Sequence, residues 1–528
     1  MDEVLARIAA CLVCTTLFCI GTWQSLGAMQ QGGYQNGKFM RWLRNKDNLL
    51  FNRLWVWALC LALSSAVTAL CFSFLGTVGG LAVSAIPFLG LSLFFVWADR
   101  KYALKVPVKN TPRCKRLFVA YYFITAVFSY IFIAVLAFLA KWNGSGIYAV
   151  IAYVPFAATP VFLPILLCAA NGVMCVFEKA HNEKFIKRAG QVLNQTEIIR
   201  VAVVGSYGKT SVKHILATVL AEKYSVAYTP ASYNTPLGIA LTVNNPLFAG
   251  KQVFIAEMGA RKAGDIQQLC DMVKPNFAIF TGVCPQHVET FGSLENVWQE
   301  KSKIFQTGAK VVCAESLQER VGDTPCILAK RENIKNINLQ ATKTSFTLTL
   351  DGQDIQVETT LLGEAAIENI LLAATLAYEM GLSVQEIASG LSKVQPIPHR
   401  LQLIQSGSAY ILDDGYNANV RGAGEALKAL CRFSGRRCVV TPVLVECGIL
   451  QAELNGRLGE MIANAKVDKV ILVGETLVGA VKNGYIKAGG NAETCATVKT
   501  LTDAQALLQT WIGAGDCVLF LNDLPDVY

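Results

Sequence analysis

A glycine-rich segment near the middle of the chain carries residue types that bind phosphate. It follows the β-branched run Ile198–Val204 and reads Gly205-Ser206-Tyr207-Gly208-Lys209-Thr210-Ser211. Small residues let backbone N–H groups approach phosphate oxygens, and the start of a following helix adds the positive end of its dipole. Lys209 would neutralise phosphate charge, and the Thr210 hydroxyl would hold Mg²⁺. The spacing is that of a shortened phosphate loop, because Val203 stands where the usual motif has its first glycine.

Later in the chain stand three residues, Glu257, His287 and Lys301, with side chains that suit a metal site. Glu257 follows the predicted buried strand Val253–Ala256, at the carboxyl end where open α/β sheets bind ligands. His287 follows the predicted strand Phe277–Thr281, and Lys301 lies in a helical stretch after it. Each alone has an ordinary explanation: a solvated strand end, a capped loop residue, or one charge on a helix face. Their succession after a phosphate loop favours a shared function.

The combination resembles the Mur ligases, cell-wall enzymes that join amino acids or peptides to a muramic acid carboxylate. The likeness is greatest to the members that add D-alanyl-D-alanine. It extends from about Ile198 to the C-terminus and includes the stretches Ser232–Ile239, Gly292–Asn296 and Asp413–Asn419. The resemblance implies an ATP-dependent ligase that uses Mg²⁺, forms a C–N bond and releases ADP and phosphate.

Roles for single residues in the central part of the chain follow from the resemblance. Segment 205–211 would hold ATP, chiefly through Lys209, and Thr210, Glu257 and His287 would hold magnesium. Lys301 would be carbamylated and would help to bind a second magnesium, because a bare ammonium group would repel the metal.

The C-terminal domain of the family closes over ATP with an arginine and an aspartate, which Arg400 and Asp414 match. Asn369 matches an asparagine that lies beside the nucleotide. The family usually has a His-Asn-x-x-Asn pattern here, whereas this chain has Ala365-Ala366 at the first two positions. The first asparagine contact is therefore missing. The catalytic set implied by the resemblance is Lys209, His287, Lys301, Arg400 and Asp414.

The first 190 residues have a different composition. Five apolar stretches are long enough for a bilayer span of roughly 20 residues. They are Leu5–Met29, Leu54–Leu75, Gly79–Trp97, Leu117–Leu139 and Ile147–Ala170. They account for a hydrophobic content of 53% and a mean hydropathy of +0.39. Lys and Arg gather in the loops 30–53 and 99–116, which the positive-inside rule places in the cytoplasm.

We therefore expect a multi-pass protein of the bacterial cell membrane, with its N-terminus outside and its catalytic domains in the cytoplasm. Membrane lipid would be a partner, with wall-synthesis proteins as further partners. The formal charge of +9 then reflects the basic loops, so no nucleic acid is expected. A cleaved signal peptide explains only the first stretch. A transporter is disfavoured because no Asp, Glu or His interrupts the middle of a span.

Strand and helix patterns alternate after the phosphate loop. The stretches Ala409–Asp413, Cys438–Leu444, Lys469–Val473 and Cys517–Leu521 are strand-like, and the stretch Thr344–Thr360 has a hairpin pattern. Alternation favours a parallel sheet covered on both faces. The predicted fold is a five-span helical membrane bundle over 1–190, a P-loop-type α/β domain over 196–395, and a Rossmann-like α/β domain over 396–528.

The predicted reaction activates an acceptor carboxylate as an acyl phosphate, which an amine then attacks. The amine would be D-alanyl-D-alanine or a similar compound, and the acceptor a UDP-linked or lipid-linked muramoyl peptide. A glutamate-using or amidating Mur-type ligase is the first alternative. A non-enzymatic ATP-binding platform is the second, and it predicts damaged metal ligands, although Glu257, His287 and Lys301 are present.

Overall fold

The computed structural model describes residues 2–44, 54–63, 89–97, 108–143, 159–284, 291–416, 419–445, 447–474 and 477–521. The chain divides into two compact units, the first ending at His181 and the second beginning at Asn182. The first unit is helical, whereas the second alternates strands and helices. The predicted change from a helical to an α/β part of the chain is therefore confirmed.

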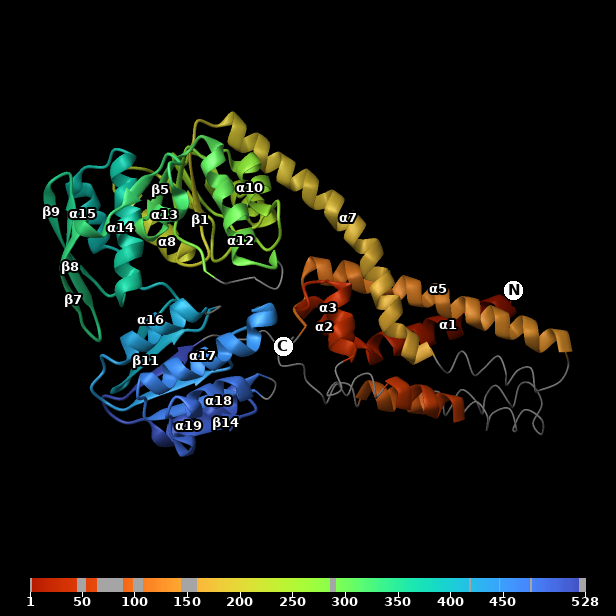
Figure 1. Ribbon diagram of the computed structural model, residues 1–528. Coiled ribbons are helices and arrows are strands. Elements are labelled where there is room, and N and C mark those ends of the chain that lie inside the picture. The colour runs from red at the N-terminus through yellow and green to blue at the C-terminus, as the bar shows by residue number, and fades with distance from the viewer. Residues whose placement is uncertain are drawn as a thin grey trace. The chain divides into compact units, whose positions relative to one another are not determined.

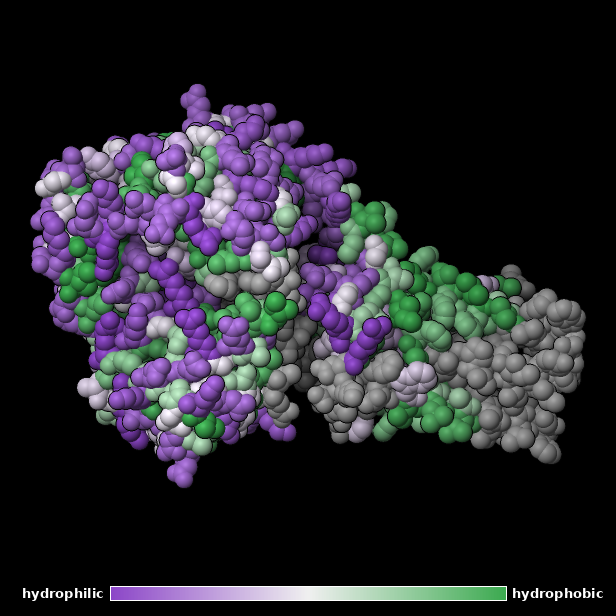
Figure 2. Space-filling model, in the orientation of Figure 1, coloured by the Kyte–Doolittle hydropathy of each residue, from purple (hydrophilic) through white to green (hydrophobic). Residues whose placement is uncertain are grey.

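Helices of the first unit pack around an apolar core. They are α1 (Asp2–Gly21), α2 (Trp23–Gln31), α3 (Asn36–Arg44), the helix Leu54–Leu63, a helix over 89–97, α5 (Pro112–Asn143) and the first part of α7 (Thr159–Gln195). Phe18, Met29, Trp57 and Tyr121 are buried in this core. Figure 2 shows hydrophobic side chains gathered over α5 and α7, where Phe123 and Val176 are among the exposed residues.

The prediction of a multi-pass membrane protein with five spans is wrong. Among the described residues only α5 and α7 are long and apolar enough to cross a membrane, or three segments if one bent pair is counted as a span. That pair, Cys11–Gly21 and Trp23–Gln31, bends by 49° at Thr22, within the stretch Leu5–Met29 that was predicted to be one span.

Two further predicted spans are covered only in part. The described helices Leu54–Leu63 and 89–97 lie within the stretches 54–75 and 79–97, and the rest of both stretches lies outside the described residues. Residues 147–158 of the last predicted span also lie outside the described residues. The span differs at its end, since α7 continues as a helix to Gln195 through the predicted amphipathic link 178–195. An apolar window reports composition, and it detects neither a bend nor the extension of a helix into polar sequence.

A six-stranded parallel sheet forms the first half of the second unit. Its strands are β1 (Ile199–Val204), β2 (Val226–Tyr228), β3 (Val253–Glu257), β4 (Phe277–Phe280), β5 (Lys310–Ala314) and β6 (Ile327–Ala329). The strand order is β2-β3-β1-β4-β5-β6, and every neighbouring pair is parallel. Because β1 lies between β3 and β4, the loop after β1 meets the carboxyl ends of both neighbours.

Helices cover both faces of this sheet (Figure 1). Val201 and Val203 of β1 face a core shared with α8 (Lys209–Leu220), α14 (Glu364–Glu379) and α15 (Val384–Ser392). Ala202 and Val204 face the opposite core, with α9 (Pro236–Val243), α10 (Asp265–Val273) and α12 (Leu294–Lys301). Alternate residues of one strand thus enter two cores, which is the burial expected of a central parallel strand.

A three-stranded antiparallel sheet extends this half of the unit. It consists of β7 (Ile334–Leu339), β8 (Thr344–Leu350) and β9 (Gln353–Thr359), in that order. The hairpin predicted over 344–360 corresponds to β8 and β9, with its turn at Asp351-Gly352. Strand β7 was not predicted, because its burial pattern is mostly exposed and carries no regular alternation.

A second six-stranded sheet forms the rest of the unit. Its strands are β10 (Gln402–Ser406), β11 (Ala409–Asp414), β12 (Arg437–Thr441), β13 (Lys469–Val473), β14 (Cys495–Val498) and β15 (Cys517–Leu521). The order is β10-β11-β15-β12-β13-β14, with only β10 antiparallel to its neighbour. Its main helices are α16 (Val420–Leu430), α17 (Gln451–Asn464), α18 (Val478–Lys487) and α19 (Leu501–Trp511). The predicted α/β character of this region is confirmed.

Candidate active site

The phosphate loop is held tightly between strand β4 and helix α14. Gly205 has φ 150° and Gly208, which precedes α8, has φ 72°. A Cβ atom would lie 2.0 Å from Thr281 Oγ1 at Gly205 and 2.6 Å from Asn369 Oδ1 at Gly208. Both glycines are therefore needed for close approach. The Thr281 hydroxyl donates to the Tyr207 carbonyl at 2.5 Å, which fastens the loop to the end of β4.

Two lysines converge on the same carbonyl of this loop. Lys209 Nζ and Lys301 Nζ each lie 2.9 Å from the Gly205 carbonyl oxygen, and Lys301 also donates to Ser206 Oγ at 3.0 Å. Burial lowers the pKa of both lysines, and their mutual repulsion lowers the pKa of Lys301 further. The two amino groups thus lie together at the phosphate loop, where burial and repulsion favour the uncharged amine of Lys301.

A carboxylate stands beside the start of α8. Glu257 Oε2 accepts from Thr210 Oγ1 at 3.0 Å and from Lys213 Nζ at 3.1 Å, while Asn234 donates to Oε1 at 3.2 Å. Burial opposes ionisation of Glu257, but Lys213 and Lys209 outweigh it and hold the pKa of its carboxyl below the usual value. Glu257 is therefore a buried, ionised oxygen donor next to the Thr210 hydroxyl.

Lys213 is a residue of this site that the sequence did not reveal to us. Its side chain is fully buried, and it also donates to the Ala231 carbonyl at 2.5 Å. It lies one helical turn after Lys209 on α8, among the apolar residues that face the sheet. A lysine among the apolar positions of this helix could have indicated a buried ion pair, since a buried charge needs a partner.

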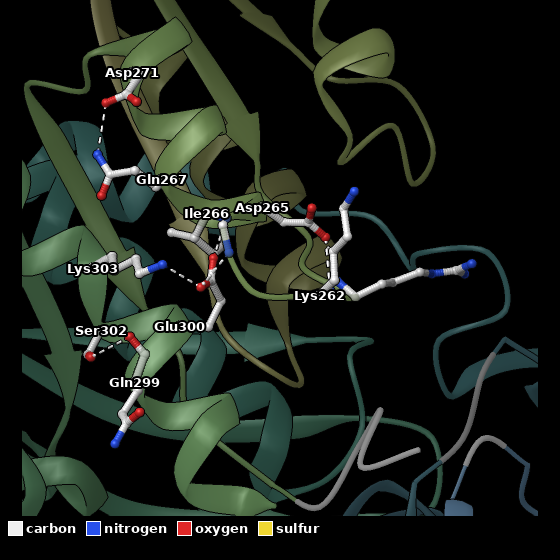
Figure 3. A network of polar contacts seen from close by, with 11 residues as sticks. Lys262, Asp265, Ile266, Gln267, Asp271, Gln299, Glu300, Ser302 and Lys303 are labelled. Carbon is white, nitrogen blue, oxygen red and sulfur yellow. Dashed lines mark hydrogen bonds and ion pairs between the residues drawn. The ribbon is translucent and has the colours of Figure 1, made fainter. Parts of the chain in front are cut away.

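Glu300 is a second residue that the sequence did not reveal. Its carboxylate accepts from the backbone of Gly264 at 2.9 Å and of Ile266 at 2.7 Å, and it pairs with Lys303 at 2.6 Å. Figure 3 shows the Glu300 carboxylate directed at the first turn of α10 and at Lys303. Glu300 directly precedes Lys301, so the end of α12 is braced against α10 on one side and the phosphate loop on the other.

Arg400 lies in the loop before β10, and Asp414 is the last residue of β11 in the second sheet. Arg400 donates to Thr210 Oγ1 at 3.4 Å and to the Tyr416 carbonyl at 3.0 Å, and its guanidinium lies 4.3 Å from the Tyr416 ring centroid. Burial raises the pKa of the Asp414 carboxyl to about 6, although Arg400 opposes the shift. The Leu401 backbone donates to Asp414 Oδ1 at 3.1 Å. The structure thus brings Arg400 to the phosphate loop across 190 residues of sequence.

A cleft with a volume of 570 Å³ opens at this site, and Lys213, Glu300 and the predicted Gly205 are not among the residues that line it. Of the predicted site residues, Ser206, Tyr207, Gly208, Lys209, Thr210, Ser211, Glu257, Lys301, Asn369, Arg400 and Asp414 all line it. Ala365 and Ala366 line it too, in place of the usual His-Asn pair. His287 lies outside the described residues, and no group of three or more His, Cys, Asp or Glu within the described part of the chain forms a metal site.

Two protein-family models match the second unit of the chain. A model of the Mur ligase middle domain matches residues 203–377, and a model described as the Mur ligase glutamate ligase domain matches residues 399–522. Together the two matches cover more than half of the chain. The first covers the phosphate loop, Glu257, Lys301 and Asn369, and the second covers Arg400 and Asp414.

Curated relatives match over much the same region. The chain is 29% identical over 307 residues to the UDP-N-acetylmuramoyl-tripeptide–D-alanyl-D-alanine ligase of Escherichia coli (strain K12). This match covers 55% of this chain and 68% of the relative. It is 28% identical over 290 residues to the protein of that name from Haemophilus influenzae, covering 52% of this chain and 63% of the relative. The matches thus span about two thirds of these relatives.

Solved structures share the fold. MurF from Acinetobacter baumannii has a TM-score of 0.59 at 21% identity, covering 66% of this chain and 78% of that structure. MurF from Thermotoga maritima in complex with ADP has a TM-score of 0.59 at 24% identity, covering 66% and 81%. At these identities the likeness shows the fold, and the two family matches give the same assignment from the sequence. The chain belongs to the Mur ligase family of ATP-dependent amide ligases.

Proposed function

We propose that this protein joins D-alanyl-D-alanine to the peptide carboxylate of a muramoyl tripeptide, in the synthesis of peptidoglycan precursors. The observation that carries the proposal is the single cleft in which Lys209, Lys301 and Arg400 surround the phosphate loop beside Glu257. The curated relatives carry this activity in their names.

Phosphoryl transfer demands positioning and charge neutralisation more than covalent help from the protein. The loop N–H groups and Lys209 would hold the ATP phosphates, and Arg400 would approach them from the second sheet. An oxygen of the acceptor carboxylate attacks the γ-phosphorus, and the bond to the bridging oxygen of ADP breaks. The amine of D-alanyl-D-alanine then attacks the acyl carbon, loses a proton and expels inorganic phosphate.

Magnesium fits the residues beside the loop. The Thr210 hydroxyl and the Glu257 carboxylate are hard oxygen donors of the kind Mg²⁺ prefers, and they lie 3.0 Å apart. Glu257 stays ionised because Lys213 and Lys209 lower the pKa of its carboxyl. We assign these two residues to the metal, with His287 as a further ligand. When bound, Mg²⁺ neutralises charge on the transferring phosphoryl group.

Lys301 is proposed as a site of carbamylation. Carbon dioxide reacts with a neutral amine, and burial together with Lys209 lowers the pKa of Lys301 well below its usual range. The resulting carbamate would carry negative charge next to Lys209 and the magnesium site. The reaction releases a proton, and the carbamate would then attract the buried ammonium group of Lys209.

The test measures phosphate release by the purified full-length protein with ATP, Mg²⁺ and D-alanyl-D-alanine, and identifies the product by mass. UDP-linked muramoyl tripeptide and a lipid-linked precursor are supplied in separate reactions. Lys209→Ala is the inactive control, since it removes the phosphate-binding cation from an unchanged cleft. We expect a product heavier by one dipeptide residue with the UDP-linked acceptor, and none with Lys209→Ala.

The other outcomes separate the alternatives. Turnover with the lipid-linked acceptor alone would reassign the carrier of the substrate. Product formation with glutamate or ammonia in place of the dipeptide would favour the glutamate-using or amidating ligase. ATP binding without product from any pair would contradict the proposal and support a non-enzymatic ATP-binding platform.

A further inference from the structure

The part of the second unit built on the sheet β1–β6 is called the central sheet domain here, and the part built on β10–β15 the second sheet domain. Arg421, in the first turn of α16, belongs to the second sheet domain and contacts two elements of the central one. Its guanidinium carbon lies 4.2 Å from the centroid of the Tyr207 ring, and one terminal nitrogen donates to the Tyr207 hydroxyl. The other terminal nitrogen pairs with Glu368 Oε2 of α14 at 2.6 Å. One side chain from the second sheet domain thus contacts both the phosphate loop and the helix beside it.

The Tyr207 end of this contact is rigid. Tyr207 is part of the phosphate loop, and its carbonyl accepts from Thr281 Oγ1. Its ring packs onto Gly282, where a Cβ atom would lie 2.0 Å from the Tyr207 hydroxyl oxygen. Burial raises the pKa of this phenol, so the hydroxyl stays protonated at neutral pH. A planar guanidinium stacked on a fixed ring defines both distance and orientation.

The Glu368 end is anchored equally closely to the loop. Glu368 directly precedes Asn369, whose side-chain oxygen lies against Gly208. At the other end of the contact, Asn419 accepts from the Gly422 backbone at 2.9 Å and caps the start of α16, which fixes the turn that carries Arg421. The contact therefore joins the capped first turn of α16 to the phosphate loop and α14.

Arg400 provides another contact between the same two domains, through Thr210. A single contact leaves a hinge free to rotate, whereas two separated contacts fix the orientation of one domain on the other. Arg421 and Glu368 also line the cleft, as do Arg400 and Thr210. In the proposed reaction the phosphate loop must meet Arg400 of the other domain, so this orientation matters for rate.

We propose that Arg421 is a positioning residue that clasps the second sheet domain onto the phosphate loop through Tyr207 and Glu368. It holds Arg400 in place for phosphoryl transfer. The proposal rests on the proposed ligase function for its kinetic readout, but the clasp itself is measurable without substrate turnover.

Kinetics of Arg421→Ala, Arg421→Lys, Tyr207→Phe and Glu368→Gln test the clasp in the full-length protein. We expect Arg421→Ala to lower kcat roughly tenfold, with a smaller change in KM for ATP, because Lys209 and the loop N–H groups remain. Arg421→Lys keeps the ion pair but loses planar stacking and recovers part of the rate. Tyr207→Phe keeps the stacking and loses only the hydroxyl contact, so its loss is smaller.

Lys428→Ala is the matched control, since it removes a cation from the same helix that pairs only with Glu425 of α16 among the described residues. We expect unchanged kinetics. The double variant Arg421→Ala/Glu368→Gln should be less impaired than the product of the single effects, because the partners act together. Folded Arg421→Ala with kcat within twofold of wild type, or fully multiplicative effects, would overturn the clasp.

A readout without turnover separates this proposal from the proposed function. Hydrogen exchange of segment 205–211 and of the first turn of α16 should be several times faster in Arg421→Ala, and unchanged in Lys428→Ala. If the wild-type protein makes no product, the faster exchange still supports the clasp. Unchanged exchange in Arg421→Ala contradicts it even where the ligase activity is present.

Discussion

The two units bury polar groups of different kinds. In the second unit Lys213 and Glu257 form an ion pair at 3.1 Å with side chains 0% and 2% exposed. In the first unit the buried polar contact between Thr22 and Tyr121 joins two neutral hydroxyls at 2.8 Å. Its ion pair between Arg116 and Glu178 is only half buried, since the Glu178 side chain is 10% exposed but the Arg116 side chain is 49% exposed.

The comparison of the two units shows where this chain buries a charged pair. Removing a charge from water costs several kcal/mol unless a partner is well placed. In the second unit the ion pair of Lys213 and Glu257 offsets this cost beside the phosphate loop, where charged groups can bind phosphate and metal. In the first unit, Ser25, Ser92 and Ser129 have buried hydroxyls without a partner among the described residues, which is tolerable for small neutral groups but not for charges.

The largest effect should come from breaking the buried ion pair. Lys213→Met leaves Glu257 as a buried carboxylate without its nearest cation, so we expect the free energy of unfolding to fall by about 3 kcal/mol. The pKa of Glu257 should rise, since Lys213 helps to lower it. Denaturant unfolding of the full-length protein measures the first effect.

The matched control is Lys330→Ala, whose partner Glu332 and own side chain are 69% and 56% exposed. Exposed pairs contribute about 0–1 kcal/mol. The double variant Lys213→Met/Glu257→Gln should recover part of the lost stability, because no unpaired charge remains. Equal losses in Lys213→Met and Lys330→Ala would refute the contrast between buried and exposed charge.

The sequence predicted the local features of the site better than its long-range contacts. Strand, glycine-rich turn and helix follow one another directly, so the phosphate loop is visible in the sequence from Ile198 to Leu220. The strand that ends at Glu257 was placed to within a residue for a similar reason. The Arg421 contact joins positions 214 residues apart, and only the folded chain brings them together.

The helical unit was predicted less well for a physical reason. Hydropathy measures whether a segment is apolar, and it does not report a bend such as the one at Thr22. A Cβ at Gly21 would lie 2.8 Å from the Trp57 ring, so the glycine allows that ring to approach beside the bend.

Buried Asp414 should make the stability of the protein depend on pH. Burial raises the pKa of its carboxyl in the folded protein to about 6, above its ordinary value of 3.8. The folded state therefore binds this proton more tightly than the unfolded chain. The resulting stabilisation is complete below pH about 4 and is lost as pH rises through about 6.

Asp414→Asn removes this titration. The stability of wild type relative to the variant should fall by about 2.5 kcal/mol between pH 4 and pH 7. Unfolding free energies of both proteins at several pH values measure the difference. Parallel pH profiles for the two proteins would show that Asp414 ionises as it does in the unfolded chain.

Glu300 offers a smaller effect within the same unit. Glu300→Ala leaves the backbone N–H groups of Gly264 and Ile266 without their acceptor, and we expect a loss of about 2 kcal/mol in unfolding free energy. Glu300→Gln keeps one acceptor oxygen and should lose less. Glu295→Ala, on the same helix and 61% exposed, is the control. A loss in Glu295→Ala as large as in Glu300→Ala would argue against the brace at α10.

The smallest effect is expected in the first unit, at the hydroxyl pair beside the bend. Tyr121→Phe removes the contact with Thr22, but the Thr22 hydroxyl keeps its bond to the Phe18 carbonyl at 2.8 Å. We expect a local loss of about 1 kcal/mol, because a neutral hydrogen bond contributes that much net. Hydrogen exchange of residues 19–26 should then be about fivefold faster, and unchanged in Tyr130→Phe, whose side chain is 40% exposed. A loss equal to that of Lys213→Met would remove the contrast between neutral and charged burial, since the two units would then depend on their polar contacts to the same degree.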